Sequence, residues 1–149
     1  MVKSVNHVSK RASGVTICCE KDILLAKRCE TWEGKPISLG GYWSIFGGAI
    51  EDGESPMTAA IRELYEESRI KINLHQLSYT KDIYSNFSGE ITEFSVYFSY
   101  SSYKPEVILN EEHTEYIWYP LEKIQDFPYN IQQDLIDCIV MYRDNRYQF

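Results

Sequence analysis

The stretch SPMTAAIRELYEES, residues 55–68, constrains the fold more than any other part of the chain. Ser55 is a residue type that caps helix N-termini, and Pro56 suits a first helical turn. Apolar or small side chains then recur with the spacing of one helix face, at Met57, Ile61, Leu64 and Ser68. The pattern predicts a capped amphipathic helix over residues 56–68, with one face that packs against a core.

The same helix concentrates negative charge. Glu63, Glu66 and Glu67 fall on a second face, where like charges three or four residues apart cost on the order of 0.2–0.5 kcal/mol per pair. With the upstream stretch GGAIEDGE, residues 47–68 hold six carboxylates and one base, Arg62. Three acidic residues alone are typical of a solvated helix face. Behind a glycine turn and an acidic loop they indicate a divalent-cation site, because Mg²⁺ prefers oxygen ligands, often carboxylates and substrate phosphates.

Two other sites of related pattern are excluded. An EF-hand with its turn glycine at Gly53 needs carboxylates at positions 48 and 50 and a glutamate at 59, where the chain has Gly, Ile and Ala. A Walker A loop needs Lys directly after its last glycine, and here Ala49 follows Gly48.

The rest of the chain predicts short strands and a second helix. The strands are expected at residues 13–19, 22–28, 42–46, 76–85, 92–100 and 115–120. The strand 42–46 is expected to end at Gly47-Gly48, and Phe94, Val96 and Phe98 to share one face of their strand. Residues 29–41, rich in Gly and Pro, predict a looser connection.

The second helix is expected over residues 130–144, capped by Asn130. Its buried stripe is expected at Ile131, Leu135, Cys138 or Ile139, and Tyr142. Strands and two helices mix without a regular βαβ alternation. The predicted class is therefore α+β or a mixed-sheet sandwich.

Composition narrows the cellular setting. The 149 residues suffice for one domain, expected to span 1–149, and a net charge of −7 argues against an extended nucleic-acid surface. No apolar run approaches the ~20 residues that cross a bilayer, and residues 1–14 lack the apolar region of a signal peptide. A cytoplasmic protein without membrane contact is expected. The four cysteines show no C-x-x-C spacing and are expected to be buried thiols, not disulfide or zinc partners.

Residues 48–70 resemble the Nudix box, G-x5-E-x7-R-E-U-x-E-E-x-G-U, where U is aliphatic. The matching positions are Gly48, Glu54, Arg62, Glu63, Leu64, Glu66, Glu67 and Ile70. Arg69 takes the place of the box glycine. Weaker resemblance extends to the stretches GVTICCEKDILLAKR, WSIFGG and EEHTEYIWYPLEKI, with Phe46 where the family often has proline.

The resemblance implies a Nudix fold, with a mixed sheet between helices, and a Nudix pyrophosphohydrolase. Such an enzyme uses Mg²⁺ or Mn²⁺ to hydrolyse a nucleoside diphosphate linked to another group. By position, Glu66 and Glu67 are implied as metal ligands, Glu63 as a ligand or the base that activates water, and the Gly47 carbonyl as a further ligand. Arg62, in the catalytic set, is implied to orient the glutamates, and Glu54 to hold the loop against the helix.

Residues outside the box carry weaker expectations. In the turn expected around residues 111–115, Glu112 or His113 could supply a further metal ligand or base, the alternative being a polar loop. Arg28, Trp32 and Trp43 are candidates for contacting phosphate or base, with core packing the alternative for the tryptophans. Arg69 is expected either to adopt a left-handed helix end, at roughly 1 kcal/mol, or to extend the helix.

The substrate class stays open. Candidates are nucleotide sugars such as ADP-ribose or a GDP-hexose, dinucleoside polyphosphates, and nucleoside triphosphates cleaved to monophosphates. A non-catalytic Nudix-fold nucleotide-binding or sensor module is the alternative, although such a module would usually lack ligand glutamates. The acidic balance disfavours mRNA decapping. The oligomeric state is also open, with a homodimer one option.

Overall fold

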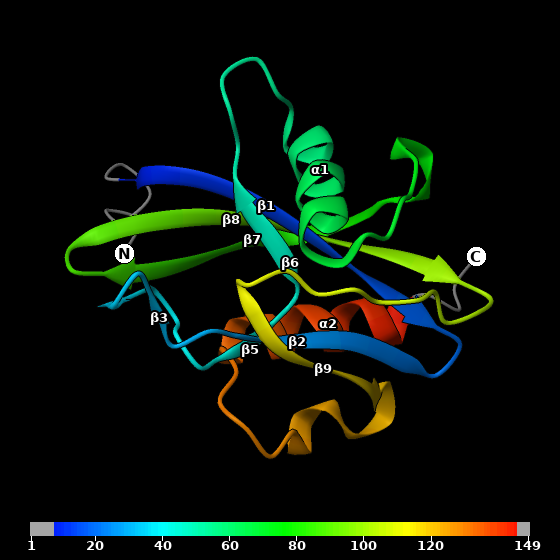
Figure 1. The fold of residues 1–149 in the computed structure, drawn as a ribbon. Coiled ribbons are helices and arrows are strands. Elements are labelled where there is room, and N and C mark those ends of the chain that lie inside the picture. The colour runs from blue at the N-terminus through cyan, green and yellow to red at the C-terminus, as the bar shows by residue number, and fades with distance from the viewer. Residues whose placement is uncertain (1–7, 146–149) are drawn as a thin grey trace.

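A seven-stranded mixed sheet forms the centre of the structure, a computed structural model that describes residues 8–145 (Figure 1). Its strand order is β5-β2-β1-β8-β7, with β6 paired to β1 and β9 to β2. Strands β1 and β8 run parallel, and the other strand pairs are antiparallel. The strands are β1 (Val8–Cys19), β2 (Asp22–Arg28), β5 (Trp43–Ser44), β6 (Phe46–Ala49), β7 (Ser78–Phe87), β8 (Glu90–Ser101) and β9 (His113–Pro120).

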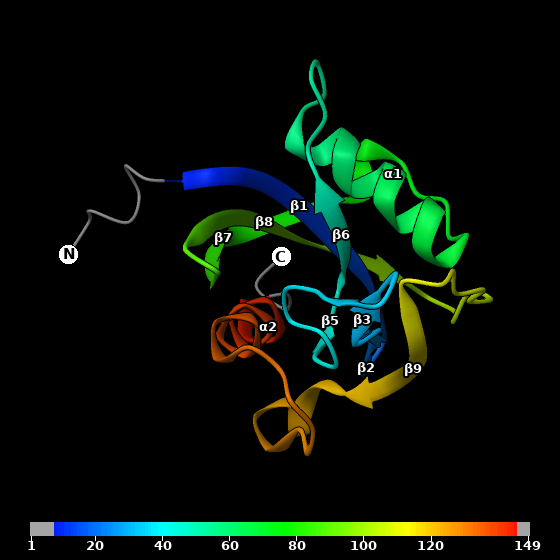
Figure 2. The ribbon, with the colours of Figure 1, turned by 60° about the vertical axis from the view of Figure 1, so that its left-hand side comes forward.

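Two helices cover opposite faces of this sheet (Figure 2). Helix α1 (Pro56–Ser68) packs through Ala60 and Leu64 against one face, which includes Val15, Leu24 and Phe46. Helix α2 (Gln133–Asn145) and the 3₁₀ helix η3 (Leu121–Asp126) pack against the other. A small hairpin of β3 (Thr31–Trp32) and β4 (Lys35–Pro36) and the 3₁₀ helix η2 (Leu74–Gln76) complete the elements. This is the α+β arrangement that the sequence predicts.

Helix α1 has the predicted bounds, and its cap is formed as predicted. The Ser55 hydroxyl accepts the backbone N–H of Thr58 at 3.1 Å. The buried face differs from the prediction: Met57 and Ile61 are only half-buried, and Glu67 is buried instead. Arg69 ends the helix with a left-handed backbone, at φ +64°, and donates its N–H to the Tyr65 carbonyl at 2.9 Å.

The predicted strand 42–46 is wrong in its end point. It is two strands, and Gly47 and Gly48 lie inside β6, opposite Gly14 and Ser13 of β1. The strands approach so closely that a Cβ on Gly47 would lie 2.5 Å from the Ser13 carbonyl oxygen. The two glycines therefore continue the strand where a larger side chain would not fit.

The predicted cap of α2 is also wrong. The Asn130 carbonyl accepts the Trp43 N–H at 2.8 Å, and Ile131 forms a bridge with Trp43, so this segment stays extended and the helix begins at Gln133. The expected buried face of this helix is confirmed at Leu135, Cys138 and Ile139, which are all buried.

Other expectations have mixed outcomes. Val96 and Phe98 are buried on one face with Phe94 packed against them, as predicted, and all four cysteines are buried without disulfides. The strand expected at residues 115–120 is present as β9, but it begins earlier, so that His113, expected in a turn, lies in the strand. Of the N-terminal segment expected not to be a signal peptide, residues 1–7 lie outside the described residues. No helix within residues 8–145 has the length and apolar character needed to cross a membrane.

Candidate active site

Arg62 organises the carboxylates of the loop and of α1. Its Nε and Nη2 donate to the two oxygens of Glu54 at 2.8 and 3.0 Å, a bidentate pair. Its Nη1 donates to Glu63 at 3.0 Å and to both oxygens of Glu66 at 3.3 Å. Its Nη2 also reaches the Ala49 carbonyl at 3.1 Å. One guanidinium thus ties the acidic loop, the end of β6 and two glutamates of α1 together.

The pKa values follow these contacts. The hydrogen bond to Glu54 and the charges of Glu63 and Glu66 raise the pKa of Arg62, so it stays charged. The hydrogen bonds from Arg62 and from the Glu51 N–H lower the pKa of Glu54. Glu54 therefore holds the loop against the helix as a carboxylate.

Glu67 has a different environment. Its side chain is 1% exposed, and Oε1 accepts the Gly47 N–H at 3.1 Å. Burial, a hydrogen bond with Glu63 and the charge of Glu112 raise its pKa. Within the described part of the chain, no Lys or Arg forms an ion pair with Glu67. A buried carboxylate beside two others, without a cation, is unfavourable.

The turn before β9 borders this carboxylate. Asn110 Nδ2 donates to Glu112 Oε2 at 3.1 Å, and Asn110 Oδ1 accepts the Glu112 N–H at 3.1 Å. His113 is buried with its Nδ1 3.9 Å from Glu67 Oε1 and its ring edge-on to Phe46. Within the part of the chain that the structure describes, neither ring nitrogen has a hydrogen-bond partner. Burial lowers the pKa of His113 to about 4, so the ring is neutral at pH 7.

Strand β6 separates the carboxylates from a pocket. A Cβ on Gly48 would lie 2.5 Å from the Glu63 carboxyl group, so this glycine leaves room for that side chain. Gly47 and Gly48 also line a pocket of about 200 Å³ on the sheet face that α2 covers. The glycine backbone is therefore the boundary that the pocket and the carboxylate cluster share.

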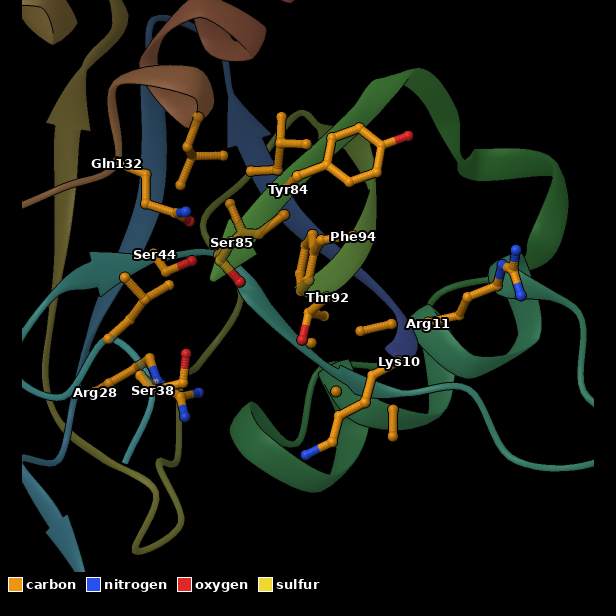
Figure 3. Close-up of a pocket in the computed structure, with 18 residues that line it drawn as sticks. Lys10, Arg11, Arg28, Ser38, Ser44, Tyr84, Ser85, Thr92, Phe94 and Gln132 are labelled. Carbon is orange, nitrogen blue, oxygen red and sulfur yellow. Dashed lines mark hydrogen bonds between the residues drawn. The ribbon is translucent and has the colours of Figure 1, made fainter. Parts of the chain in front are cut away.

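Residues from six strands (β1, β2, β5, β6, β7 and β8) and from α2 line this pocket (Figure 3). Phe94, Ile83 and Leu135 are among its apolar walls, and Ser44 and Gln132 are among its polar ones. Its charged residues are all basic: Lys10, Arg11 and Arg28. Lys10 and Arg11 pair with Glu90 and Glu93, and Figure 3 shows the Arg11 guanidinium pointing away from the pocket.

Of the three residues expected to contact substrate, only Arg28 lines the pocket. Arg28 lines the pocket, where its Nε donates to the Ser38 carbonyl at 3.1 Å, and no carboxylate within residues 8–145 forms an ion pair with it. Trp43 packs in the core against Phe127 and Tyr129, outside the pocket lining. Trp32, in the small hairpin, is 41% exposed and does not line the pocket either.

The carboxylate cluster suits a divalent cation in its chemistry. Glu63 and Glu67 share a hydrogen bond, and the charge of Glu112 acts on Glu67. Among residues 8–145, no Lys or Arg pairs its positive charge with the buried Glu67. Mg²⁺ or Mn²⁺ would supply that charge, and carboxylates and a glycine carbonyl are suitable ligands. Among the described residues, no three acidic, His or Cys side chains already converge in metal-binding geometry, since Arg62 also engages Glu63 and Glu66.

Curated relatives match parts of the chain. An RNA pyrophosphohydrolase of Agrobacterium fabrum is 39% identical over 61 residues, 36% of this chain and 36% of that protein. An 8-oxo-dGTP diphosphatase of Proteus vulgaris is 35% identical over 63 residues, 41% of this chain and 50% of that protein. The matched parts thus span no more than half the length of these two relatives.

Solved structures share the fold over nearly the whole chain. A MutT protein from Methanosarcina mazei aligns with a TM-score of 0.77 and 23% identity, covering 93% of this chain and 95% of that one. A C. elegans Ap4A hydrolase aligns with a TM-score of 0.71 and 21% identity, covering 94% and 99%. A bifunctional NMN adenylyltransferase/ADP ribose pyrophosphatase from Francisella tularensis, complexed with AMP and a Mn ion, gives 0.68 and 20%, covering 91% and 41%.

A family profile described as the NUDIX domain matches residues 8–137, from the first described strand into α2. This match includes the box-like segment, all the strands of the sheet and the turn before β9. The chain therefore belongs to the Nudix family.

Proposed function

We propose that the protein hydrolyses a diphosphate bond in a nucleoside diphosphate linked to another moiety, with Mg²⁺ or Mn²⁺. The observation that carries the proposal is Glu67, a buried carboxylate beside Glu63 and Glu112 with no basic partner in the described residues. The named activities of the two curated relatives, and the Mn ion in a structural neighbour, support a nucleotide-derived substrate and a divalent cation.

Glu66, Glu67, Glu112 and the Gly47 carbonyl are the proposed ligands, with Glu63 a further ligand or the base. These residues would hold a divalent cation, which would supply positive charge against the diphosphate and make a nearby water more acidic. Glu63 is the proposed acceptor of the proton of the attacking water. Two observations support it: Arg62 orients one of its oxygens at 3.0 Å, and Gly48 has no Cβ that would displace its carboxyl group. Arg62 acts by orienting Glu63 and Glu66 and by fixing the loop through Glu54.

The pocket is the proposed site for the nucleoside part of the substrate. It combines apolar walls with Ser44 and Gln132, and it meets the carboxylate cluster at Gly47 and Gly48. A nucleoside seated there would direct its diphosphate across the glycine backbone toward the glutamates. Arg28 is the proposed contact for substrate phosphate.

The proposed substrate is thus a small nucleotide derivative, and nucleotide sugars, dinucleoside polyphosphates and nucleoside triphosphates are the classes to compare. An extended nucleic acid is disfavoured by the net charge of −7. A cytoplasmic location and the oligomeric state stay predictions.

A panel assay tests the function. About twenty nucleotide derivatives are incubated with purified protein and Mg²⁺ or Mn²⁺, and released nucleoside monophosphate is measured. Metal-dependent release from at least one derivative, lost in Glu66→Gln, is the expected result. Tight binding of a derivative without any release would instead identify a non-catalytic nucleotide-binding module.

Arg28→Ala tests the pocket assignment. We expect KM for the best substrate to rise about tenfold to a hundredfold with kcat nearly unchanged, because one charged hydrogen bond to the bound substrate is worth about 1.5–3 kcal/mol. Lys27→Ala, the adjacent residue whose ammonium pairs with Glu115 at 3.7 Å, is the matched control and should keep the wild-type KM. Equal KM values in both variants would remove Arg28 from the substrate site.

A further inference from the structure

The turn at residues 110–113 is fixed to the end of α1 by backbone hydrogen bonds. The Ile108 N–H donates to the Ser68 carbonyl at 3.0 Å, and the Asn110 N–H donates to the Glu67 carbonyl at 3.3 Å. The last carbonyls of a helix have no partner within the helix, so this segment satisfies two of them. These two hydrogen bonds attach the turn to the C-terminal end of α1, at the backbone of the buried Glu67.

The Asn110 side chain bonds twice within this turn. Its Oδ1 accepts the Glu112 N–H at 3.1 Å, which closes an Asx turn, and its Nδ2 donates to Glu112 Oε2 at 3.1 Å. Glu112 has a third contact, with another segment of the chain: its carbonyl accepts the Cys29 N–H at 2.9 Å. The Glu112 backbone and carboxylate are therefore both held, and Asn110 is the residue that holds both.

We propose that Asn110 is a positioning residue that aims the Glu112 carboxylate at the cluster of Glu63 and Glu67. This inference rests on the proposed function, in which Glu112 serves the cation site. A glutamate on a polar loop would otherwise sample several rotamers, and ordering it costs conformational entropy. The amide donor of Asn110 removes that freedom by holding Glu112 Oε2. The Glu112 carboxylate so held lies close enough for its charge to act on Glu67.

Asn110→Ser is the informative variant. Serine keeps a short acceptor for the Glu112 N–H but removes the amide that holds the carboxylate, without changing the charge. Asn86→Ser is the matched control, because Asn86 Oδ1 likewise accepts a turn N–H, that of Gly89 at 3.2 Å, in the β7–β8 turn. Both variants are also made in a Glu112→Gln background.

Two readouts are measured for each variant. We expect Asn110→Ser to lower kcat about tenfold with KM within twofold, and to raise severalfold the Mn²⁺ concentration that half-saturates the rise in unfolding temperature. Asn86→Ser should change neither. In the Glu112→Gln background, Asn110→Ser should have less than a twofold further effect on either readout, because the carboxylate that it positions is gone.

The outcomes separate this inference from the proposed function. Wild-type kcat and Mn²⁺ response in Asn110→Ser, or an equally large effect in the Glu112→Gln background, would overturn the positioning role. If no derivative is hydrolysed but the Mn²⁺ response shifts as expected, the hydrolase proposal fails and the positioning of Glu112 stands.

Discussion

At the scale of single residues, burial separates three glutamates that share a helix face in the sequence. The Glu66 side chain is 50% exposed, that of Glu63 13% and that of Glu67 1%. Arg62 neutralises the first two through one nitrogen, so the repulsion between them is largely offset. The electrostatic strain of the cluster is therefore concentrated at Glu67, which its sequence position alone does not indicate.

Glu67→Gln tests this assignment. The amide can still accept the Gly47 N–H, and it cannot ionise, so folding no longer has to keep a carboxyl group protonated that ionises freely in the unfolded chain. We therefore expect the metal-free protein to gain about 1–3 kcal/mol in unfolding free energy at pH 7. Stabilisation by Mg²⁺ should largely vanish, and turnover should fall about 10²–10³-fold or more. Glu66→Gln is the control: it should lose comparable activity without the gain in metal-free stability, since its carboxylate is exposed and paired. A less stable metal-free Glu67→Gln protein would contradict the assignment.

The raised pKa of Glu67 should also make the stability of the metal-free protein depend on pH. Burial and acidic neighbours raise the folded-state pKa of Glu67 above its ordinary value of 4.5, so the folded state binds its proton more tightly than the unfolded state. This contribution to stability is complete below pH ~4.5 and is lost as the pH rises through the folded pKa. Burial lowers the pKa of His113 to about 4, so the folded state binds its proton less tightly than the unfolded state. His113 therefore reduces stability only as the pH falls below its ordinary pKa of 6.5.

The measurement is urea unfolding in EDTA between about pH 7 and 8.5, where His113 is neutral in both states. The stability advantage of Glu67→Gln over wild type should widen as the pH rises. Curves that stay parallel across this range would show that Glu67 does not keep a raised pKa.

At the scale of elements, the site depends on how β6 lies between β1 and α1. Gly47 faces the backbone of β1, where a Cβ would meet the Ser13 carbonyl oxygen and the Gly14 Cα at 2.5 and 2.8 Å. Gly48 faces the movable end of Glu63 instead. Neither glycine has a positive φ, so alanine is tolerated by the backbone at both positions and only the neighbours differ.

Alanine substitutions should therefore separate stability from activity. Gly48→Ala should displace the Glu63 carboxylate, lowering turnover at least tenfold while the unfolding temperature changes by about 2 °C or less. Gly47→Ala should destabilise the fold by about 1–3 kcal/mol, because the β1 backbone cannot yield cheaply. Circular dichroism melts and the hydrolysis assay measure both effects. Full activity in Gly48→Ala would show that the position of Glu63 does not matter.

The elements show where sequence reasoning succeeds. The start of helix α1 was predictable because its signals are local: Ser55 caps it and Pro56 starts it. Its end was open between two alternatives at Arg69, and the structure has the left-handed one. The continuation of β6 through Gly47 and the late start of α2 were not predictable, because both depend on partners distant in sequence, Ser13–Gly14 and Trp43.

At the scale of the whole molecule, the candidate site has two parts. The carboxylates of α1 and of the loop before it come from one continuous segment, and the pocket is assembled from residues that are distant in sequence. The spacing of those carboxylates together with the glycine turn predicts a cation site. The pocket draws Arg28, Ser44, Phe94 and Gln132 from separate elements, and no local pattern marks them. Asn110 is similar, because its role follows from contacts with α1 and with Glu112.

The decisive measurement is a metal depletion and restoration experiment on the best substrate of the panel. Protein treated exhaustively with EDTA and then exchanged into metal-free buffer should release no nucleoside monophosphate above background. Adding Mg²⁺ or Mn²⁺ should restore full turnover in wild type and less than about one per cent of it in Glu67→Gln. Turnover that survives complete depletion, or a Glu67→Gln protein that recovers to the wild-type rate, would contradict a hydrolase whose buried carboxylates hold a divalent cation.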